Sequence, residues 1–221
     1  MVTQFYLIPA WFFGYDIVLE LLFVVVTALV AFFSIKVYRI SQERDFKLLG
    51  YSFISISISY FLLATLNLLA ASSQITSEII TITLRNIIIP SSIWIYAYIF
   101  FFIGGLSLLA YLTFNIRNQR LFALIASMSL IVVIFSERTG VAFNFVAAVL
   151  LFYVFLHYLD RFKKSNDKKL LFVMLAFLLL FFARISFAFS YFNPLPYVAD
   201  HLIELIAYFL ILVSLIRVVR K

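Results

Sequence analysis

The distribution of basic residues is the feature that most constrains the fold of this chain. Fourteen of its 17 Lys and Arg residues fall into four clusters, and each cluster follows a strongly apolar stretch. The clusters lie at residues 36–47, 117–120, 161–169 and 217–221. Only Arg85 and Arg138 lie in the alternate connections, and Arg184 lies inside an apolar stretch. Because cytoplasmic loops of membrane proteins carry excess Lys and Arg, the pattern predicts that the clusters face the cytoplasm.

The composition predicts that a lipid bilayer covers much of the surface. Hydrophobic residues make up 66% of the chain, and the mean hydropathy is +1.13. A soluble domain of this size cannot bury so much apolar surface. The net charge of +7 comes from residues at the ends of apolar stretches, so we expect no nucleic-acid partner. The chain has no Cys, which excludes thiolate metal sites and disulfides, and its start lacks the basic region of a cleaved signal peptide.

Seven stretches are long and apolar enough for a spanning helix, which needs roughly 20 residues. They cover residues 16–36, 48–71, 91–114, 121–136, 140–160, 169–192 and 198–217. The sequence therefore predicts an all-α, multi-pass protein of the cell membrane, with one seven-helix domain over residues 1–221. Its N-terminus is expected outside and its C-terminus in the cytoplasm. Aromatic residues near the outer ends, among them Trp11, Trp94, Tyr191 and Tyr197, are predicted to lie at the membrane interface.

Residues 74–89 do not fit this scheme of spans. They are apolar but contain Arg85, and together with the third predicted helix they would form a rod of about 54 Å, longer than a bilayer is thick. Proline is favoured at the first position of a helix, so Pro90 is predicted to begin the third helix. The segment before it is predicted to be an outer connection at the interface.

Polar residues inside the predicted spans are candidates for a binding pocket, because they are costly within the hydrocarbon region. The candidates are Glu20, Asn144, Arg184, Asp200, His201, Glu204 and Tyr208. Counting along each helix from its inner basic cluster places Glu20, Asn144, Arg184 and Glu204 about 20–25 Å from the inner boundary. These four groups are therefore expected in one layer of the outer half, with Asp16 and Asp200 nearer the rim.

Two interpretations of this layer remain open. In the first, Arg184 serves structure alone, paired with Glu20 or Glu204, since an unpaired buried charge is expensive. Alternatively, the excess carboxylates form an outward-facing pocket for a cation, an amine or a metal. Asp200, His201 and Glu204, with Glu20, are weak metal-ligand candidates. His157 and His201 lie near opposite membrane faces, which argues against a bis-histidine haem, and no cofactor is predicted.

Small residues on the predicted second and third helices indicate close helix packing. Ser52, Ser55 and Ser59 recur at helical spacing on the second, and Gly104 and Gly105 are adjacent on the third. Small residues let helices approach closely in lipid, and serines can also line a hydrophilic path.

Three stretches carry a resemblance to a known class of membrane regions. The first predicted helix ends in Lys36-Val37-Tyr38-Arg39, the second opens with Leu48-Leu49-Gly50-Tyr51-Ser52-Phe53, and residues 201–217 close the chain. With an outer N-terminus, the chain resembles the seven-helix sensor regions that precede archaeal and bacterial histidine kinases. The resemblance implies a non-enzymatic sensor. Because no output domain follows Lys221 here, such a sensor is expected to signal through a membrane or cytoplasmic partner. A small transporter or cation pathway, and a metal-dependent intramembrane enzyme, are the alternatives.

The topology can be tested by cysteine labelling, because the chain has no Cys of its own. A single Cys near the N-terminus is expected to react with an impermeant maleimide added to intact cells. A single Cys near the C-terminus is expected to react only after permeabilisation. Labelling of both positions from one side would contradict the predicted odd number of crossings.

Overall fold

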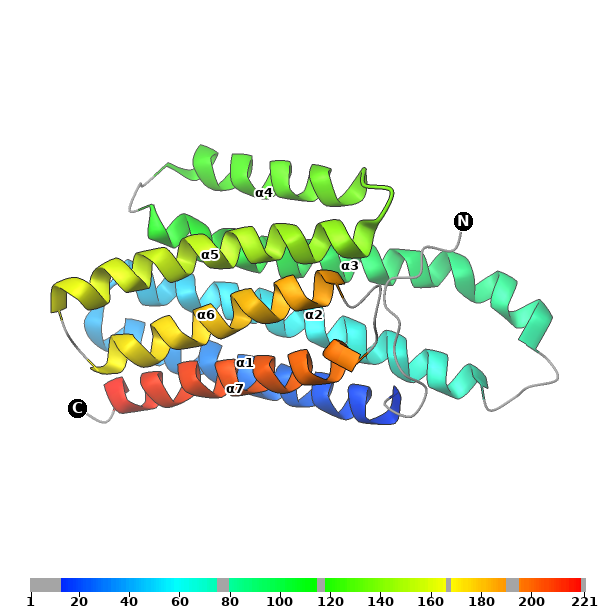
Figure 1. The fold of residues 1–221 in the computed structure, drawn as a ribbon, viewed down its shortest axis with the longest axis horizontal. Helices are drawn as coiled ribbons and strands as arrows, with labels where there is room; N and C mark the ends of the chain where they lie inside the picture. Colours follow the sequence, from blue (N-terminus) through cyan, green and yellow to red (C-terminus); the bar gives the residue numbers. More distant parts are fainter. Residues whose placement is uncertain (1–12, 75–79, 115–117, 166–167, 190–194, 220–221) are drawn as a thin grey trace.

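The computed structural model describes residues 13–74, 80–114, 118–165, 168–189 and 195–219, and in these ranges the fold is all-helical (Figure 1). The helices are α1 Phe13–Ser41, α2 Arg44–Gln74, α3 Ile80–Thr113, α4 Gln119–Ile134, α5 Thr139–Ser165, α6 Lys168–Phe189 and α7 Leu195–Val219. Six of them are long and apolar enough to span a membrane, which confirms a multi-pass membrane protein, and α4 is a shorter apolar helix. The predicted boundaries agree within five residues, except at the start of the third helix.

The prediction that Pro90 begins the third helix is wrong, because residues 80–89 already belong to that helix; residues 75–79 lie outside the described residues. Helix α2 continues to Gln74 and α3 already begins at Ile80, so that Pro90 lies inside α3 rather than at its start. The thickness of a bilayer limits the apolar length of a span, but it does not require the helix to end at the interface. Both helices therefore extend beyond the others at one end of the bundle (Figure 1). The part of α3 that qualifies as a span, Ile93–Thr113, matches the predicted range 91–114.

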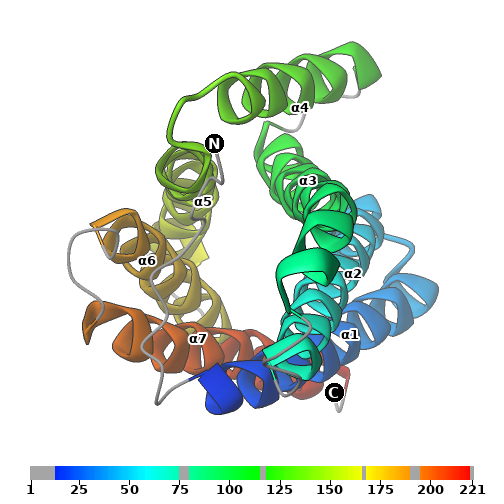
Figure 2. The ribbon, with the colours of Figure 1, turned by 90° about the vertical axis from the view of Figure 1, so that its right-hand side faces the viewer.

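Six helices form a closed ring, and α4 lies outside it (Figure 2). Around the ring the order is α1, α2, α3, α5, α6 and α7, so that α7 packs against α1. Helix α4 packs on the outer side of α3 and α5 and runs antiparallel to both (Figure 1). Val133 is the one buried residue among the described residues of α4. The core consequently belongs to the six ring helices.

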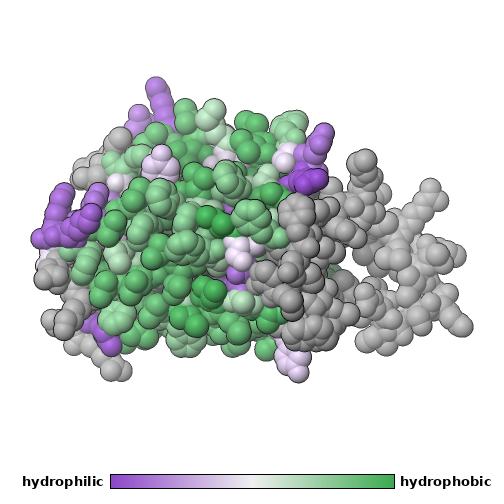
Figure 3. All heavy atoms as spheres, viewed as in Figure 1, coloured by the Kyte–Doolittle hydropathy of each residue, from purple (hydrophilic) through white to green (hydrophobic). Residues whose placement is uncertain are grey.

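The interior of the ring is filled by large apolar side chains. Phe53, Phe143 and Phe177 are fully buried at its centre, each from a different helix. Leu, Ile, Val and Phe side chains also cover the outside of the bundle, where hydrophilic residues gather toward the ends (Figure 3). An apolar outer surface is stable only in lipid, so the helices associate through close packing rather than through exclusion of water.

The serines of α2 take part in this packing. Ser55 Oγ donates a hydrogen bond of 2.6 Å to the backbone oxygen of Phe101 in α3, and Ser57 Oγ donates one of 3.0 Å to that of Val24 in α1. Ser52 and Ser59 donate instead to backbone oxygens of their own helix. These contacts favour the interpretation of the serine stripe as a seam between helices.

The two adjacent glycines of α3 differ in the space around them, which provides a matched test. A Cβ atom on Gly105 would lie 2.8 Å from the backbone oxygen of Ser52 and from Cγ1 of Ile56, whereas the nearest atom to a Cβ on Gly104 is Ser55 Oγ at 4.0 Å. Because backbone cannot yield easily, Gly105→Ala is expected to destabilise the bundle by about 1–3 kcal/mol. Gly104→Ala is expected to be neutral or stabilising by up to about 1 kcal/mol. Unfolding in mixed micelles titrated with a denaturing detergent measures both, and equal effects would contradict the close approach at Gly105.

Candidate functional site

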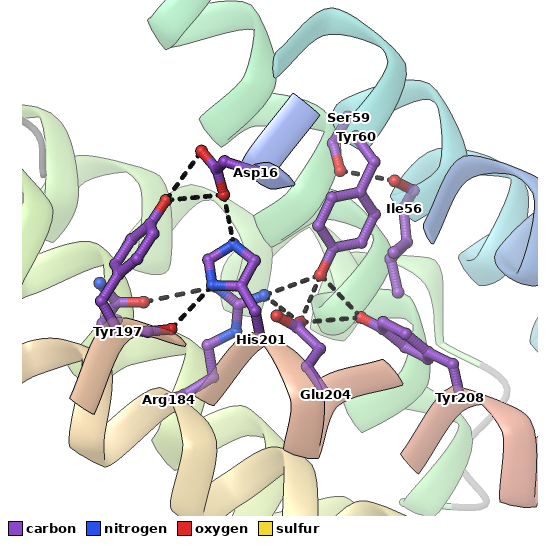
Figure 4. A network of polar contacts seen from close by, with 10 residues as sticks. Asp16, Ile56, Ser59, Tyr60, Arg184, Tyr197, His201, Glu204 and Tyr208 are labelled. Atoms are coloured by element: carbon purple, nitrogen blue, oxygen red, sulfur yellow. Dashed lines mark hydrogen bonds and ion pairs between the residues drawn. The ribbon is translucent and has the colours of Figure 1, made fainter. Parts of the chain in front are cut away.

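The candidate site is a buried polar network between α1, α2, α5, α6 and α7 (Figure 4). Helix α7 contributes a polar stripe at helical spacing, made of Tyr197, His201, Glu204 and Tyr208. Residues at this spacing lie on one face of a helix, and all four are buried. The side chains of this stripe meet Asp16 and Glu20 of α1 and Arg184 of α6, and they form two adjoining clusters.

The first cluster is centred on the ion pair of Arg184 with Glu204, which are 3% and 1% exposed. Arg184 Nη2 and the Tyr60 hydroxyl of α2 both donate to Oε1 of Glu204. Arg184 Nη2 also donates to Tyr60 Oη at 2.8 Å, and Tyr208 Oη donates to Glu204 Oε1 at 3.3 Å. Glu204 therefore has a cation and two hydroxyl donors, as a buried carboxylate requires. Of the two partners that the sequence left open for Arg184, the structure selects Glu204.

Arg184 is also held by an amide and by aromatic rings. Its Nη1 donates to Oδ1 of Asn144 in α5 at 3.4 Å, and the Asn144 amide donates to the backbone oxygen of Gly140 at 3.0 Å. The guanidinium carbon lies 4.4 Å from the ring centroid of Phe102 and 5.4 Å from that of Phe187. Rings at such distances attract a desolvated cation. The predicted placement of Asn144 in the layer of Arg184 is thus confirmed.

The second cluster joins α1 to α7 through Asp16. Tyr197 Oη donates to both carboxylate oxygens of Asp16 at 3.1 Å, and His201 Nε2 lies 3.1 Å from Oδ1. His201 Nδ1 lies 3.0 Å from the backbone oxygen of Tyr197. A carbonyl oxygen only accepts a hydrogen bond, so Nδ1 carries the hydrogen of this contact, and Nε2 is the ring nitrogen that faces Asp16.

Glu20 lies beside this cluster with one oxygen unused. The Asn67 amide donates to Glu20 Oε1 at 2.8 Å and lies 3.5 Å from Asp16 Oδ2. Among the described residues, Oε2 of Glu20 has no hydrogen-bond partner. Glu20 lines a cavity of about 10 Å³ together with Arg184, His201 and Glu204, which is room for about one water molecule.

Asp200 is not part of either cluster. It is 2% exposed and hydrogen-bonds with Ser186 of α6, while its Oδ2 lacks a partner within the described ranges. In the part of the chain that the structure describes, no three His, Asp or Glu side chains are grouped closely enough to hold a metal ion. The weak metal prediction for Asp200, His201 and Glu204 therefore has no support from the geometry.

Three residues of the network were not predicted as site residues from the sequence, although Asn67 was placed on the serine side of the second helix. Tyr60 and Asn67 lie seven residues apart, two turns along the same face of α2, and this spacing was a usable signal. Tyr197 was assigned to the outer interface, yet it is 2% exposed and donates to Asp16. An aromatic residue at a helix end suits either place, so its sequence position alone did not distinguish them. Trp11 and Tyr191 lie outside the described residues.

The comparisons with known proteins add no identification. No family model matches the chain, and neither the curated proteins nor the solved structures contain a match. The resemblance to histidine-kinase sensor regions stays a prediction from the sequence. Function is therefore inferred from the residues of the network.

The ion pair of the first cluster predicts a large loss of stability when one partner is removed. Arg184→Met leaves Glu204 buried without its cation, so we expect a destabilisation of about 3–5 kcal/mol. The matched control is Asp45→Asn, which breaks the pair of Asp45 with Arg161, where 41% and 48% of the side chains are exposed. That change is expected to cost less than about 1 kcal/mol. Detergent-induced unfolding of both variants measures the difference, and similar small losses would show that Arg184 is not required by the core.

Proposed function

We propose that the chain is a non-enzymatic membrane sensor whose outer-half network receives a proton or a small cation. Helix α7 carries the polar stripe and continues to the opposite end of the bundle, so it is the element that would transmit the change. The output would be read by a membrane or cytoplasmic partner. A proton or cation pathway through the same carboxylates is the second candidate.

The imbalance of charge in the network is the observation that supports this proposal. Three carboxylates are buried in the network, those of Asp16, Glu20 and Glu204, and that of Asp200 is buried outside its two clusters. Among the described residues, the buried basic side chains are Arg184 and His201. Buried charges are stable only when they are paired, and one Arg with one His cannot pair four carboxylates, so a further proton or cation is needed. The free oxygens of Glu20 and Asp200 are where such a ligand would bind.

The size of the cavity restricts the class of ligand. A volume of about 10 Å³ accommodates about one water molecule, and ligand pockets for organic molecules measure roughly 300–1,000 Å³. An amine or a metabolite would require the helices to separate. A proton, or a cation that replaces one water, fits the network as it stands.

Packing below the network supports a sensor more than a pathway. Beyond Tyr208, the buried residues of α7 are the apolar Ile211, Leu212 and Leu215 and one polar residue, Ser214. Phe53 and Phe177 fill the space beside them. The α2 serines that would line a polar path hydrogen-bond to backbone instead. An ion would have to cross an apolar layer, at the cost of its hydration.

A cavity at the inner end keeps the pathway as the second candidate. It measures about 210 Å³ and lies between α2, α5, α6 and α7, with Ser214 and Ile211 among its lining residues. Ile211 is three residues from Tyr208, so less than one helical turn separates this cavity from the network. A small rotation of α7 would change the shape of this cavity. Such a rotation is also the simplest way for a signal to reach the cytoplasmic face.

The direction of the helices favours seven crossings. Helices α3 and α5 run in the same direction, so the chain between them must return to the other side of the bundle (Figure 1). Helix α4 provides that return with 16 residues, or about 24 Å, which requires local thinning of a 30 Å bilayer core. With the basic clusters in the cytoplasm, the N-terminus of the chain would lie outside.

The proposal is tested by thiol labelling in proteoliposomes. Ser214→Cys introduces the only thiol of the chain into the inner cavity, where Ser214 is 3% exposed. We expect its rate of reaction with a maleimide on the inner side to change by about fivefold or more when the outer solution is acidified or its sodium concentration is raised. Glu20→Gln with Asp200→Asn, added to this background, should abolish the change, and the exposed Asp160→Asn should not.

An entrapped pH dye distinguishes the two candidate functions in the same vesicles. A labelling response without proton flux supports the sensor. A proton flux that is abolished by Glu20→Gln would show that the protein is a proton pathway and not a sensor. A labelling rate that changes with neither acid nor sodium would contradict the proposed site altogether.

A further inference from the structure

A groove with a basic rim lies at the inner end of the bundle, remote from the network. It is formed by α1, α2, α3 and α4, and its volume is about 570 Å³. Its polar lining consists of Arg44, Lys47, two glutamines and three tyrosines (Gln42, Gln119, Tyr38, Tyr51 and Tyr111), and nothing in the network or its proposed function uses them.

The charge of the groove is entirely positive within the described residues. Arg44 and Lys47 line it, and no Asp or Glu does. The two neighbouring carboxylates, those of Glu43 and Asp45, line the inner cavity instead, and Asp45 pairs with Arg161. Residues 44, 47, 48 and 51 share one face of α2, whereas residue 45 is turned away by about 100°. The folded helix therefore sorts its charges into a basic and an acidic side.

Both cations are positioned by aromatic rings. The Lys47 ammonium lies 5.6 Å from the ring centroid of Tyr38 and 5.9 Å from that of Tyr51. Arg44 Nη2 donates to Tyr111 Oη at 2.8 Å, and the guanidinium carbon lies 5.5 Å from the Tyr111 ring. Tyr111 is buried, so it fixes the Arg44 side chain against the bundle. The remaining N–H groups of Arg44 and the three of Lys47 can donate to the oxygens of a phosphate.

The rest of the groove is apolar and is continuous with the lipid-facing surface. Leu48, Leu108 and Phe122 line it alongside the basic rim. A free phosphate makes no favourable contact with these apolar side chains, whereas a phospholipid places acyl chains directly beside its headgroup. Within the described ranges, the helices that α4 contacts are α3 and α5, so a lipid seated here would also join α4 to α2.

We propose that this groove binds an anionic phospholipid, with the headgroup phosphate between Arg44 and Lys47 and an acyl chain along Leu48, Leu108 and Phe122. Basic pockets between helices on the cytoplasmic side of a membrane attract such headgroups. The site is independent of the sensor proposal and depends only on the basic end of the bundle facing a membrane surface.

Native mass spectrometry of the full chain tests the site. The protein is released from micelles that contain phosphatidylglycerol and phosphatidylcholine in equal amounts and with identical acyl chains. We expect the wild type to retain phosphatidylglycerol preferentially. Lys47→Gln should lower that preference by about fivefold, the factor that corresponds to one basic side chain at an anionic surface. The double variant Arg44→Gln with Lys47→Gln should lower it by about 25-fold.

The control removes the same charge elsewhere at the same end. Lys163→Gln with Lys164→Gln changes two exposed residues at the end of α5 and should preserve the preference. Equal losses in both double variants would show attraction to the whole basic face and would overturn the site. Displacement of the lipid by excess inorganic phosphate would assign the groove to a free anion instead. Lys47→Gln alone keeps the Arg44–Tyr111 hydrogen bond, so it remains informative if the double variant does not fold.

Discussion

The ion pair of Arg184 with Glu204 is the constraint on which the interior depends. Bulk water does not reach either charge, so the neighbouring side chains donate to the carboxylate, accept from the guanidinium or offer it an aromatic face. Tyr60 and Asn144 meet these needs from α2 and α5, and Tyr208 does so from α7 itself. In lipid, where apolar surface does not drive helices together, such a polar centre also selects one mutual arrangement of the helices. The pair consequently sets the rotation of α6 and α7 toward each other.

Around that centre the molecule is divided along its length. One half contains the carboxylates and their donors, the middle is closed by Phe and Leu side chains, and the end that carries Arg44 and Arg161 has two unrelated surfaces. One is the cavity behind the Asp45–Arg161 pair, and the other is the basic groove beside α4. The separation allows one end to take part in ligand binding while the other interacts with lipid or a partner.

The sequence was enough to predict how deep the network lies along the helices, but not which side chains face one another around the bundle. Counting residues from each basic cluster at a fixed rise per residue gives the depth of a side chain. For this reason Arg184, Asn144 and Glu204 could be assigned to one layer. Which carboxylate faces Arg184 depends on the order of helices in the ring and on the rotation of each, and both are properties of the whole bundle. The extension of α3 to Ile80 was missed for a related reason, since hydropathy indicates where lipid ends and not where a helix does.

The contact between α1 and α7 has a consequence for biosynthesis. Asp16 and its donor Tyr197 are separated by 181 residues, so at typical elongation rates the carboxylate is made about 10–40 s before its partner. During that interval the α7 side chains that contact Asp16, those of Tyr197 and His201, have not yet been made. The nascent helix α1 must therefore remain near water or the insertion machinery, or carry neutral acids, until the ring closes.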